Sequence, residues 1–181
     1  MKHARILLVA ALPFLLLTGC GKSSSSGSTS SGGPGNAGTQ PLGKRAKTSN
    51  CHWHLPLQDQ ACTPGAVFAK ATKVQICVPG YSRGVRHVSS STKRRVYAEY
   101  GIASRKPFEY EVDHLVSLEL GGSNSIANLW PEPASPTPGF HQKDTVENYL
   151  HDQVCSGKMP LTKAQDLIAH NWIAVYRQLG H

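Results

Sequence analysis

The sequence predicts a small α+β domain in which two short strands are followed by two amphipathic helices. Two strand-like segments flank a glycine-rich turn, and two long stretches with apolar residues three and four apart follow them. Four cysteines in the same part of the chain could staple the fold. The chain has 181 residues, which is enough for one domain with a modest core but too little for two ordinary domains.

The predicted elements begin in the basic half of the chain. Lys73 to Val78 alternates between apolar and polar residues and predicts an N-terminal strand. Ser90 to Tyr100 predicts a helix, with Ser91 or Thr92 as its N-cap and Gly101 as its end.

The predicted hairpin comes next. Tyr110 to Leu120 and Ile126 to Trp130 are expected to be its strands, with residues 121–124 as the turn and Pro131 ending the second strand. Four prolines between Pro131 and Gly139 predict irregular chain there.

Two helices close the predicted domain. The first spans Phe140 to Cys155, and the second runs from Thr162 to about Leu179, where Thr162 and Gln165 have the spacing of a capping box. The residues expected on their buried sides are Val146, Tyr149, Leu150, Val154, Ala164, Leu167, Ile168, Trp172, Val175 and Tyr176. Trp130 is expected in the core with Trp172.

The N-terminus predicts export and a lipid anchor. Basic residues precede an apolar run from Ile6 to Leu17, which is the pattern of a secretory signal over residues 1–19. The run ends at Leu17-Thr18-Gly19-Cys20, which resembles the bacterial lipobox and implies lipidation of Cys20. The alternative is an ordinary signal peptide that happens to contain a cysteine. Gly21 after the cysteine favours the outer membrane of a cell that has one.

Residues 20–43 predict a flexible tether between the lipid and the domain at 44–181. Residues 21–43 include seven serines and seven glycines and show no apolar periodicity. The remaining cysteines suggest two disulfides in an oxidising compartment. We favour Cys51–Cys62 and Cys77–Cys155 over the other pairings and over a zinc site at Cys51-His52-Trp53-His54, since no Cys-x-x-Cys spacing exists.

Charge divides the domain into two halves. Residues 44–106 hold 12 basic and two acidic residues, whereas residues 107–181 hold four basic and nine acidic residues. A basic stretch of this kind attracts a polyanion through phosphate contacts, although a solvated surface or anionic lipid would also suit it. Arg83, Arg86 and Lys143 are the candidate phosphate-binding residues. Lys143 could equally pair with a neighbouring carboxylate.

Residues able to carry out chemistry concentrate between Glu111 and Asn148. Asp113 and His114 stand in the first predicted strand, and Asn128 stands in the second. The following helix carries a polar row whose members lie three and four residues apart and can share one face. Its members are His141, Asp144, Glu147 and Asn148.

The run from Glu111 to Pro131 resembles the core of the HNH endonucleases of the ββα-metal superfamily. The pieces that carry the likeness are Asp113-His114, Gly121-Gly122-Ser123-Asn124 and Asn128-Leu129-Trp130-Pro131. The likeness covers about residues 108–150, roughly a quarter of the chain. It implies a hairpin and a helix around a divalent metal, extended here by an N-terminal strand and loop region and a C-terminal helix.

The resemblance implies a role for each matching residue. His114 corresponds to the general base that activates water, Asp113 to a metal ligand, and Asn128 to a structural residue that pins the hairpin loop. The helix ligand is ambiguous, because the proline-rich stretch intervenes. Asp144 is preferred and His141 is next, with Glu147 and Asn148 behind them. Mg²⁺ is the expected ion, with Mn²⁺, Zn²⁺ or Ni²⁺ as alternatives.

These observations together predict a monomeric, exported, membrane-anchored nuclease that cuts nucleic acid without sequence preference, DNA before RNA. The alternative is a non-catalytic envelope lipoprotein that binds DNA or an anionic polymer through its basic half. A cell-wall hydrolase has less support, since neither a zinc His-x-x-x-His pair nor a free Cys-His set is present.

Overall fold

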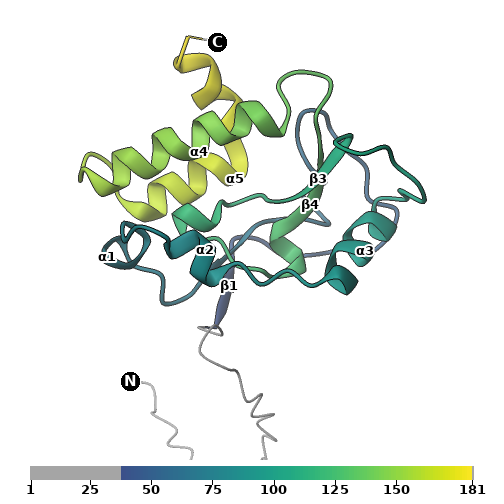
Figure 1. Cartoon of the computed structure of the whole chain (residues 1–181), viewed down its shortest axis with the longest axis horizontal. Helices are drawn as coiled ribbons and strands as arrows, with labels where there is room; N and C mark the ends of the chain where they lie inside the picture. Colours follow the sequence, from purple (N-terminus) through teal and green to yellow (C-terminus); the bar gives the residue numbers. More distant parts are fainter. Residues whose placement is uncertain (1–37, 181) are drawn as a thin grey trace, which may run out of the picture. The chain divides into compact units, whose positions relative to one another are not determined.

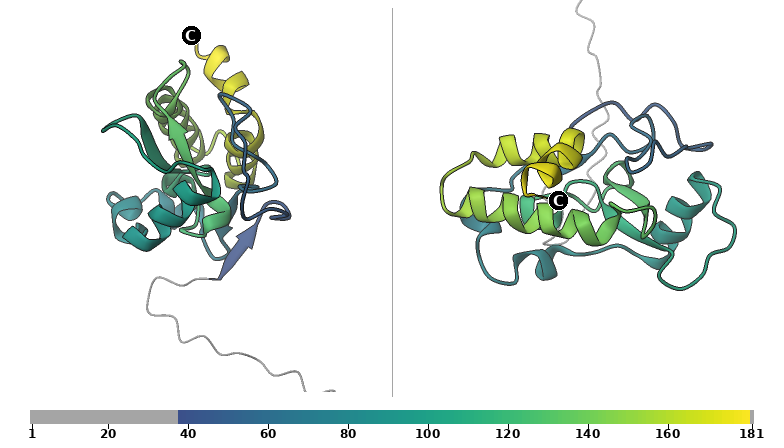
Figure 2. Two further views of the ribbon diagram at one scale, coloured as in Figure 1. Left: turned by 90° about the vertical axis from the view of Figure 1, so that its right-hand side faces the viewer. Right: turned by 90° about the horizontal axis from the view of Figure 1, so that it is seen from above.

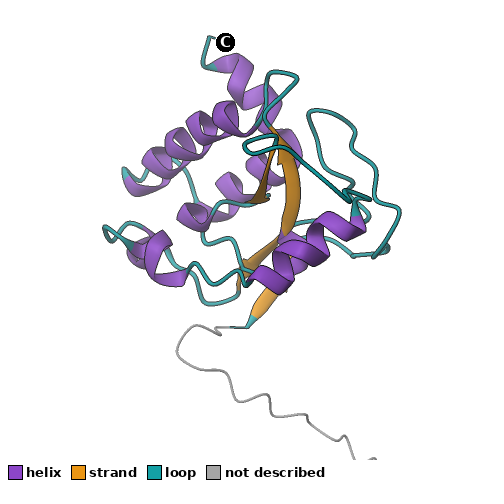
Figure 3. Ribbon diagram, turned by 45° about the vertical axis from the view of Figure 1, so that its right-hand side comes forward, coloured by secondary structure: helices purple, strands orange, loops and turns teal. Residues whose placement is uncertain are grey.

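The computed structural model describes residues 38–180, so the signal segment, Cys20 and most of the tether lie outside the described residues. The fold contains two separate two-stranded sheets and five α-helices within that range. In Figures 1 and 3 the central hairpin lies between α3 on one side and the paired helices α4 and α5 on the other. No helix in this range is long and apolar enough to cross a membrane.

The first sheet includes residues that the sequence assigns to the tether. β1 (Thr39–Pro41) pairs antiparallel with β2 (Ala66–Phe68), with Gln40 opposite Val67. Strand pairing therefore begins before residue 44, within the range predicted as tether.

The expected strand at Lys73–Val78 is a short helix instead. α1 (Lys73–Ile76) begins with a capping box in which Thr72 and Gln75 exchange hydrogen bonds. Six alternating residues cannot distinguish a short strand from a single helical turn, and the cap decides between them here. α2 (Tyr81–Val85) follows and was not predicted.

α3 (Ser90–Glu99) confirms the predicted helix but has a different cap. The side chain of Ser89 accepts the hydrogen bond from the backbone of Thr92, so neither Ser91 nor Thr92 is the N-cap. Gly101 follows the helix with a positive φ of 71°, as its predicted ending role requires.

The second sheet is the predicted hairpin with different boundaries. β3 (Tyr110–His114) pairs antiparallel with β4 (Leu129–Pro133), and Asp113 lies opposite Trp130. The flanking residues form 3-10 turns, η1 (Leu118–Leu120) and η2 (Ile126–Asn128), where strand was expected. β4 continues through its prolines because a two-stranded sheet has an unpaired edge that needs no N–H donors.

The last two helices follow the sequence pattern closely. α4 (Phe140–Cys155) has the predicted bounds, and α5 (Leu161–Gln178) matches within a residue at each end. They run side by side in both views of Figure 2. The expected capping box of α5 is absent, because Pro160 is the N-cap and the Gln165 amide donates to the carbonyl of Leu120 instead.

The core forms where α4 and α5 meet the hairpin and its loops. Trp130 and Trp172 are both fully buried, as predicted. Tyr149 is exposed, contrary to expectation, and Leu167 and Tyr176 are only partly buried. The remaining members of the predicted buried set are enclosed in the core.

Both predicted disulfides are present. Cys51–Cys62 closes a local loop with a Cα–Cα distance of 6.0 Å, and Cys77–Cys155 joins the end of α1 to the end of α4 with a Cα–Cα distance of 5.7 Å. Because Cys51 is in a disulfide, it offers no thiolate to the zinc site considered at Cys51-His52-Trp53-His54.

Candidate functional site

The candidate site forms around the end of β3, where Asp113 and His114 are consecutive. Successive side chains of a strand leave it on opposite faces, so the two residues enter different surroundings. Asp113 meets α4, whereas His114 meets the loop at Asn124. The site is therefore best described as two adjoining halves.

The loop between the strands is held by the side chain of Asn128. Its Nδ2 donates to the carbonyls of Val116 (3.0 Å) and Ser123 (2.9 Å). Its Oδ1 accepts from the backbone N–H of Val116 (2.9 Å) and of Ala66 (3.3 Å). A fully buried amide with four backbone partners fixes the path of the chain, which is the kind of contact that the resemblance implies for this residue.

The two glycines of this loop are required for different reasons. Gly121 has a φ of 76°, as its turn predicts. A Cβ on Gly122 would lie 1.7 Å from the carbonyl oxygen of Val116. Any larger residue at 122 would therefore push the loop away from the end of β3.

Lys143 forms the centre of the first half. Its side chain is fully buried, and its ammonium Nζ lies 2.6 Å from Asp113 Oδ2, 2.5 Å from Glu147 Oε1 and 2.8 Å from the carbonyl oxygen of His114. A fourth oxygen, Glu132 Oε2, lies 3.8 Å away. The structure thus shows Lys143 paired with carboxylates, and in this arrangement its ammonium does not face a phosphate in solvent.

The carboxyl groups around Lys143 differ in their protonation. Burial works to raise the pKa of Asp113, but the charge and hydrogen bond of Lys143 lower it below its usual value. Burial and the charges of Asp113 and Glu147 raise the pKa of Glu132 well above its usual value, which favours its neutral form. Burial likewise raises the pKa of Glu147 to about 7.

Lys143 itself remains charged. Burial alone would lower its pKa, but Asp113, Glu147 and Glu132 together raise it well above the ordinary value. The first half of the site is therefore a buried ammonium paired with the ionised Asp113 at 2.6 Å, while the Glu132 carboxyl lies farther away at 3.8 Å.

His114 forms the second half. Its side chain is 2% exposed, and its Nε2 lies 3.1 Å from Asn124 Oδ1. Its Nδ1 is buried and has no hydrogen-bond partner among the described residues. Burial lowers the pKa of the imidazole to about 4, although Asp113 and Asn124 work in the opposite direction. The ring is neutral at physiological pH and can accept a proton.

The predicted metal ligands are not assembled into a coordination site. The position between Asp113 and Glu147 does not fit a metal ion, because the Lys143 ammonium fills it. Asp144, His141 and Asn148 are exposed on α4.

One trio among residues 38–180 has its potential ligand atoms within 4.8 Å of one another: Cys77, His151 and Cys155. Both of its cysteines belong to a disulfide, so it supplies no thiolates.

The other carboxylates that could serve a divalent cation are Glu111 in β3 and Asp144 on α4. Partial desolvation raises the pKa of Glu111 although the residue is exposed, and the charges of Asp113 and Asp144 raise it further. The pKa of Asp144 is raised in the same way, by partial desolvation and by Asp113. These groups repel one another and carry the hard oxygen donors that Mg²⁺ prefers, but no shared binding geometry is formed.

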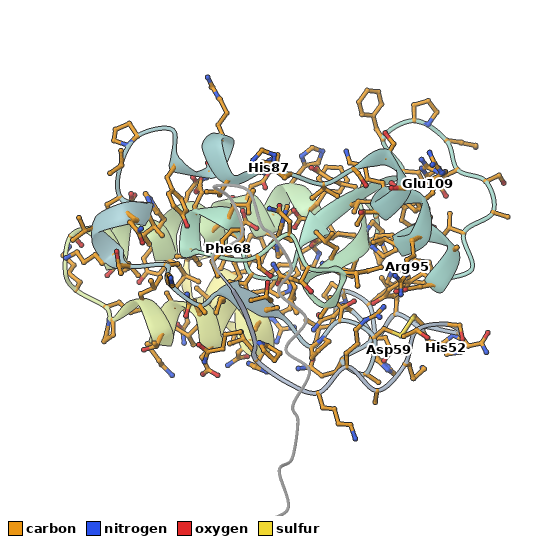
Figure 4. The ribbon with its side chains drawn as sticks, turned by 90° about the horizontal axis from the view of Figure 1, so that it is seen from below. His52, Asp59, Phe68, His87, Arg95 and Glu109 are labelled. Atoms are coloured by element: carbon orange, nitrogen blue, oxygen red, sulfur yellow. A yellow bond between two sulfur atoms is a disulfide. The ribbon has the colours of Figure 1, made fainter. Side chains whose placement is uncertain are left out.

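The basic residues approach the site from α2 and the connection after it. Arg83 and Arg86 are exposed, and the charge of Arg86 acts on both His114 and Glu111. In Figure 4, His87 lies near the middle of the view, whereas Arg95 projects from α3 towards one end. Arg95 pairs with Glu99 at 3.0 Å, so part of the basic excess is used within the domain.

Two residues of the site were not assigned a role from the sequence. Asn124 belongs to the Gly-Gly-Ser-Asn motif, to which the sequence assigned only a turn. Glu132 lies between two prolines, where irregular chain was expected. An asparagine two residues after a loop-forming Gly-Gly pair is a usable signal for Asn124. No family model, curated protein or solved structure matches this chain, so the interpretation of the site depends on its own geometry.

Proposed function

We propose that this domain is an endonuclease that hydrolyses phosphodiester bonds of nucleic acid, with DNA as the default substrate, outside the cytoplasm. The observation that carries the proposal is the neutral imidazole of His114 at the end of β3, beside a hairpin loop held by Asn128. The resemblance to HNH endonucleases assigns the general base to this residue. The two disulfides agree with an oxidising compartment.

The chemistry follows from the charges around the end of β3. A water molecule attacks phosphorus while its proton passes to the imidazole of His114, and the bond to the leaving oxygen breaks. Arg86 is the exposed cation whose charge acts on that imidazole, so it is placed to attract a phosphate. Lys143 holds Asp113 and the carbonyl of His114 in place and thereby orients the end of the strand.

No step in this mechanism passes through a metal, since the predicted ligands do not form a site. The expected Mg²⁺ is tested separately from this mechanism, because the carboxylates near the end of β3 supply oxygen donors but form no shared binding geometry. Nicking assays with different divalent ions and with EDTA show whether the reaction needs a metal ion.

Two observations favour the second candidate, a non-catalytic protein that binds a polyanion. The imidazole of His114 is almost completely buried, and an ammonium occupies the position beside Asp113 that a metal ion was expected to fill. A basic surface without a catalytic site would bind DNA and leave it intact.

A plasmid assay with the full chain separates the two candidates. Supercoiled plasmid is incubated with the protein and Mg²⁺, Mn²⁺, Zn²⁺, Ni²⁺ or EDTA, and nicking is followed on gels. We expect His114→Ala to lower the nicking rate by about 100-fold or more. His170→Ala is the matched control, because this histidine lies on α5 with an exposed side chain and should leave the rate unchanged.

Intact plasmid under every condition rejects the nuclease proposal. If filter binding then shows retained DNA that is released by salt, the binding candidate is supported; absence of retention rejects both candidates. Nicking that persists in EDTA would show that the reaction needs no divalent ion.

A further inference from the structure

We infer that Asn124 is a positioning residue that fixes the tautomer of His114, so that Nε2 carries the proton and Nδ1 is the nitrogen that accepts one from water. The catalytic part of this inference rests on the proposed function. The tautomer itself can be observed without any activity.

The orientation of the Asn124 amide is determined by the backbone around it. Its Nδ2 donates to the carbonyl of Val85 at 2.7 Å, and its Oδ1 accepts from the N–H of His87 at 3.2 Å. A flipped amide would bring oxygen against oxygen at Val85 and N–H against N–H at His87. The oxygen of Asn124 must therefore face this side of the loop.

This orientation dictates the state of the His114 ring. Asn124 Oδ1 lies 3.1 Å from Nε2 and can only accept a hydrogen bond, so Nε2 must be the donor. A neutral imidazole carries one N–H, which leaves Nδ1 with a free lone pair. The geometry of one amide is thus sufficient to select the tautomer.

The free nitrogen has no partner within the described protein. Nδ1 is buried and makes no hydrogen bond with residues 38–180. Buried acceptors in folded proteins are nearly always satisfied, and leaving one unpaired is costly. A water molecule that reached this buried nitrogen would satisfy it and could give it a proton.

The hydrogen bond to Asn124 also supports the proton transfer. When water attacks phosphorus, an O–H bond breaks and its proton binds to Nδ1, while the oxygen–phosphorus bond forms and the leaving oxygen departs. The ring then becomes an imidazolium that still donates Nε2–H to Asn124 Oδ1. The amide dipole stabilises the new positive charge without moving.

Asn124 connects the ring to the basic half of the chain as well. Its two backbone partners, Val85 and His87, lie on either side of Arg86. One amide thus holds the His114 ring and the segment that carries the nearest exposed arginine in a fixed relation. The acidic and basic halves seen in the sequence meet at this residue.

The test uses the full-length protein labelled with ¹⁵N at histidine. Long-range ¹H–¹⁵N spectra at pH 7 report which ring nitrogen is protonated, and a His114→Gln sample assigns the signal. We expect His114 to show a protonated Nε2 and an unprotonated Nδ1. Asn124→Ala should lose this single tautomer and lower kcat by about 10- to 100-fold, with KM changed less.

Asn124→Asp keeps the acceptor oxygen and should retain the Nε2–H tautomer and part of the rate. Gln178→Ala, which removes an exposed amide from the end of α5, is the control expected to change neither.

Three results would overturn the inference. They are an Nδ1–H tautomer in the unaltered protein, an even mixture of tautomers there, or an Asn124→Ala variant with unchanged spectrum and kcat. If the unaltered protein shows the expected tautomer but cuts no nucleic acid, the tautomer assignment is confirmed, while the catalytic role and the proposed function are both rejected. The wild-type spectrum decides the tautomer even where a variant fails to fold.

Discussion

Asp113 and His114 are neighbours in the chain but differ in how well their surroundings satisfy them. Asp113 belongs to a buried cluster in which a lysine ammonium meets three carboxyl groups and a carbonyl. His114 is more deeply buried than Asp113, yet one of its ring nitrogens has no partner among the described residues. The comparison separates two surroundings: Asp113 is paired with a buried ammonium that joins the hairpin to α4, whereas one ring nitrogen of His114 lacks a partner, and the proposed mechanism would use that nitrogen.

The largest effect is expected when the Lys143 ammonium is removed from the cluster around Asp113. Lys143→Met leaves the ionised Asp113 and its carboxyl neighbours buried without a counter-charge. Breaking a buried ion pair by removing one partner costs about 3–5 kcal/mol of unfolding free energy. Urea unfolding at pH 7, with the disulfides intact, measures the change.

Lys163→Met is the matched control for that prediction. Lys163 forms an exposed pair with Asp166 at 3.9 Å, and exposed pairs contribute about 0–1 kcal/mol. If both lysine variants lose the same small amount of stability, the Lys143 cluster is not the stabilising half of the site.

The next effect concerns the pH dependence of stability on the His114 side. The folded-state pKa of the ring is about 4, compared with 6.5 for an unperturbed histidine. Between these values the unfolded chain binds a proton that the folded chain does not. The pKa difference of His114 therefore costs the folded state no stability above pH 6.5. It lowers the unfolding free energy by about 3 kcal/mol as the pH falls to 4.

His114→Gln should remove that dependence. Urea unfolding of both proteins from pH 7.5 to pH 4 should show the wild type losing about 3 kcal/mol more than the variant. Glu147 has the opposite slope, because its raised pKa makes stability fall as the pH rises from 4.5 towards 7. Its contribution cancels in the difference between the two proteins. Parallel pH curves for the two proteins would show that the His114 ring is not protected from protonation.

The same comparison shows which features a sequence can predict. The Phe140–Cys155 helix was predicted because its apolar residues repeat with helical spacing and Gly157 follows it. Strand alternation also predicts that Asp113 and His114 point to different faces. On the resemblance to HNH endonucleases we expected Asp113 as a metal ligand beside His114 as the general base, whereas the structure places the two side chains in different surroundings.

The parts that escaped prediction depend on contacts between distant segments. Lys143 lies 30 residues from Asp113, and its pairing is decided by how α4 packs on the hairpin, which no local spacing encodes. Asn124 contacts the backbone at Val85, 39 residues away. The Lys73–Val78 segment was misassigned because a single cap outweighed weak alternation. Local propensity is informative for long periodic elements and weak for buried polar networks.

The smallest effect is expected at Glu132, whose carboxyl lies 3.8 Å from the Lys143 ammonium. Burial next to other carboxylates raises its pKa well above the usual value, which favours the neutral form. Glu132→Gln supplies a neutral group of similar shape and should change the unfolding free energy by less than about 1 kcal/mol.

Asp113→Asn provides the comparison, since Asp113 is ionised and bonded to Lys143 at 2.6 Å. Its loss from a buried pair should cost about 3 kcal/mol at the same pH. The urea midpoints of the two variants show which carboxyl group contributes more to the unfolding free energy. A Glu132→Gln variant less stable than Asp113→Asn would mean that Glu132 carries the negative charge facing Lys143, and that the two carboxyl groups have exchanged roles.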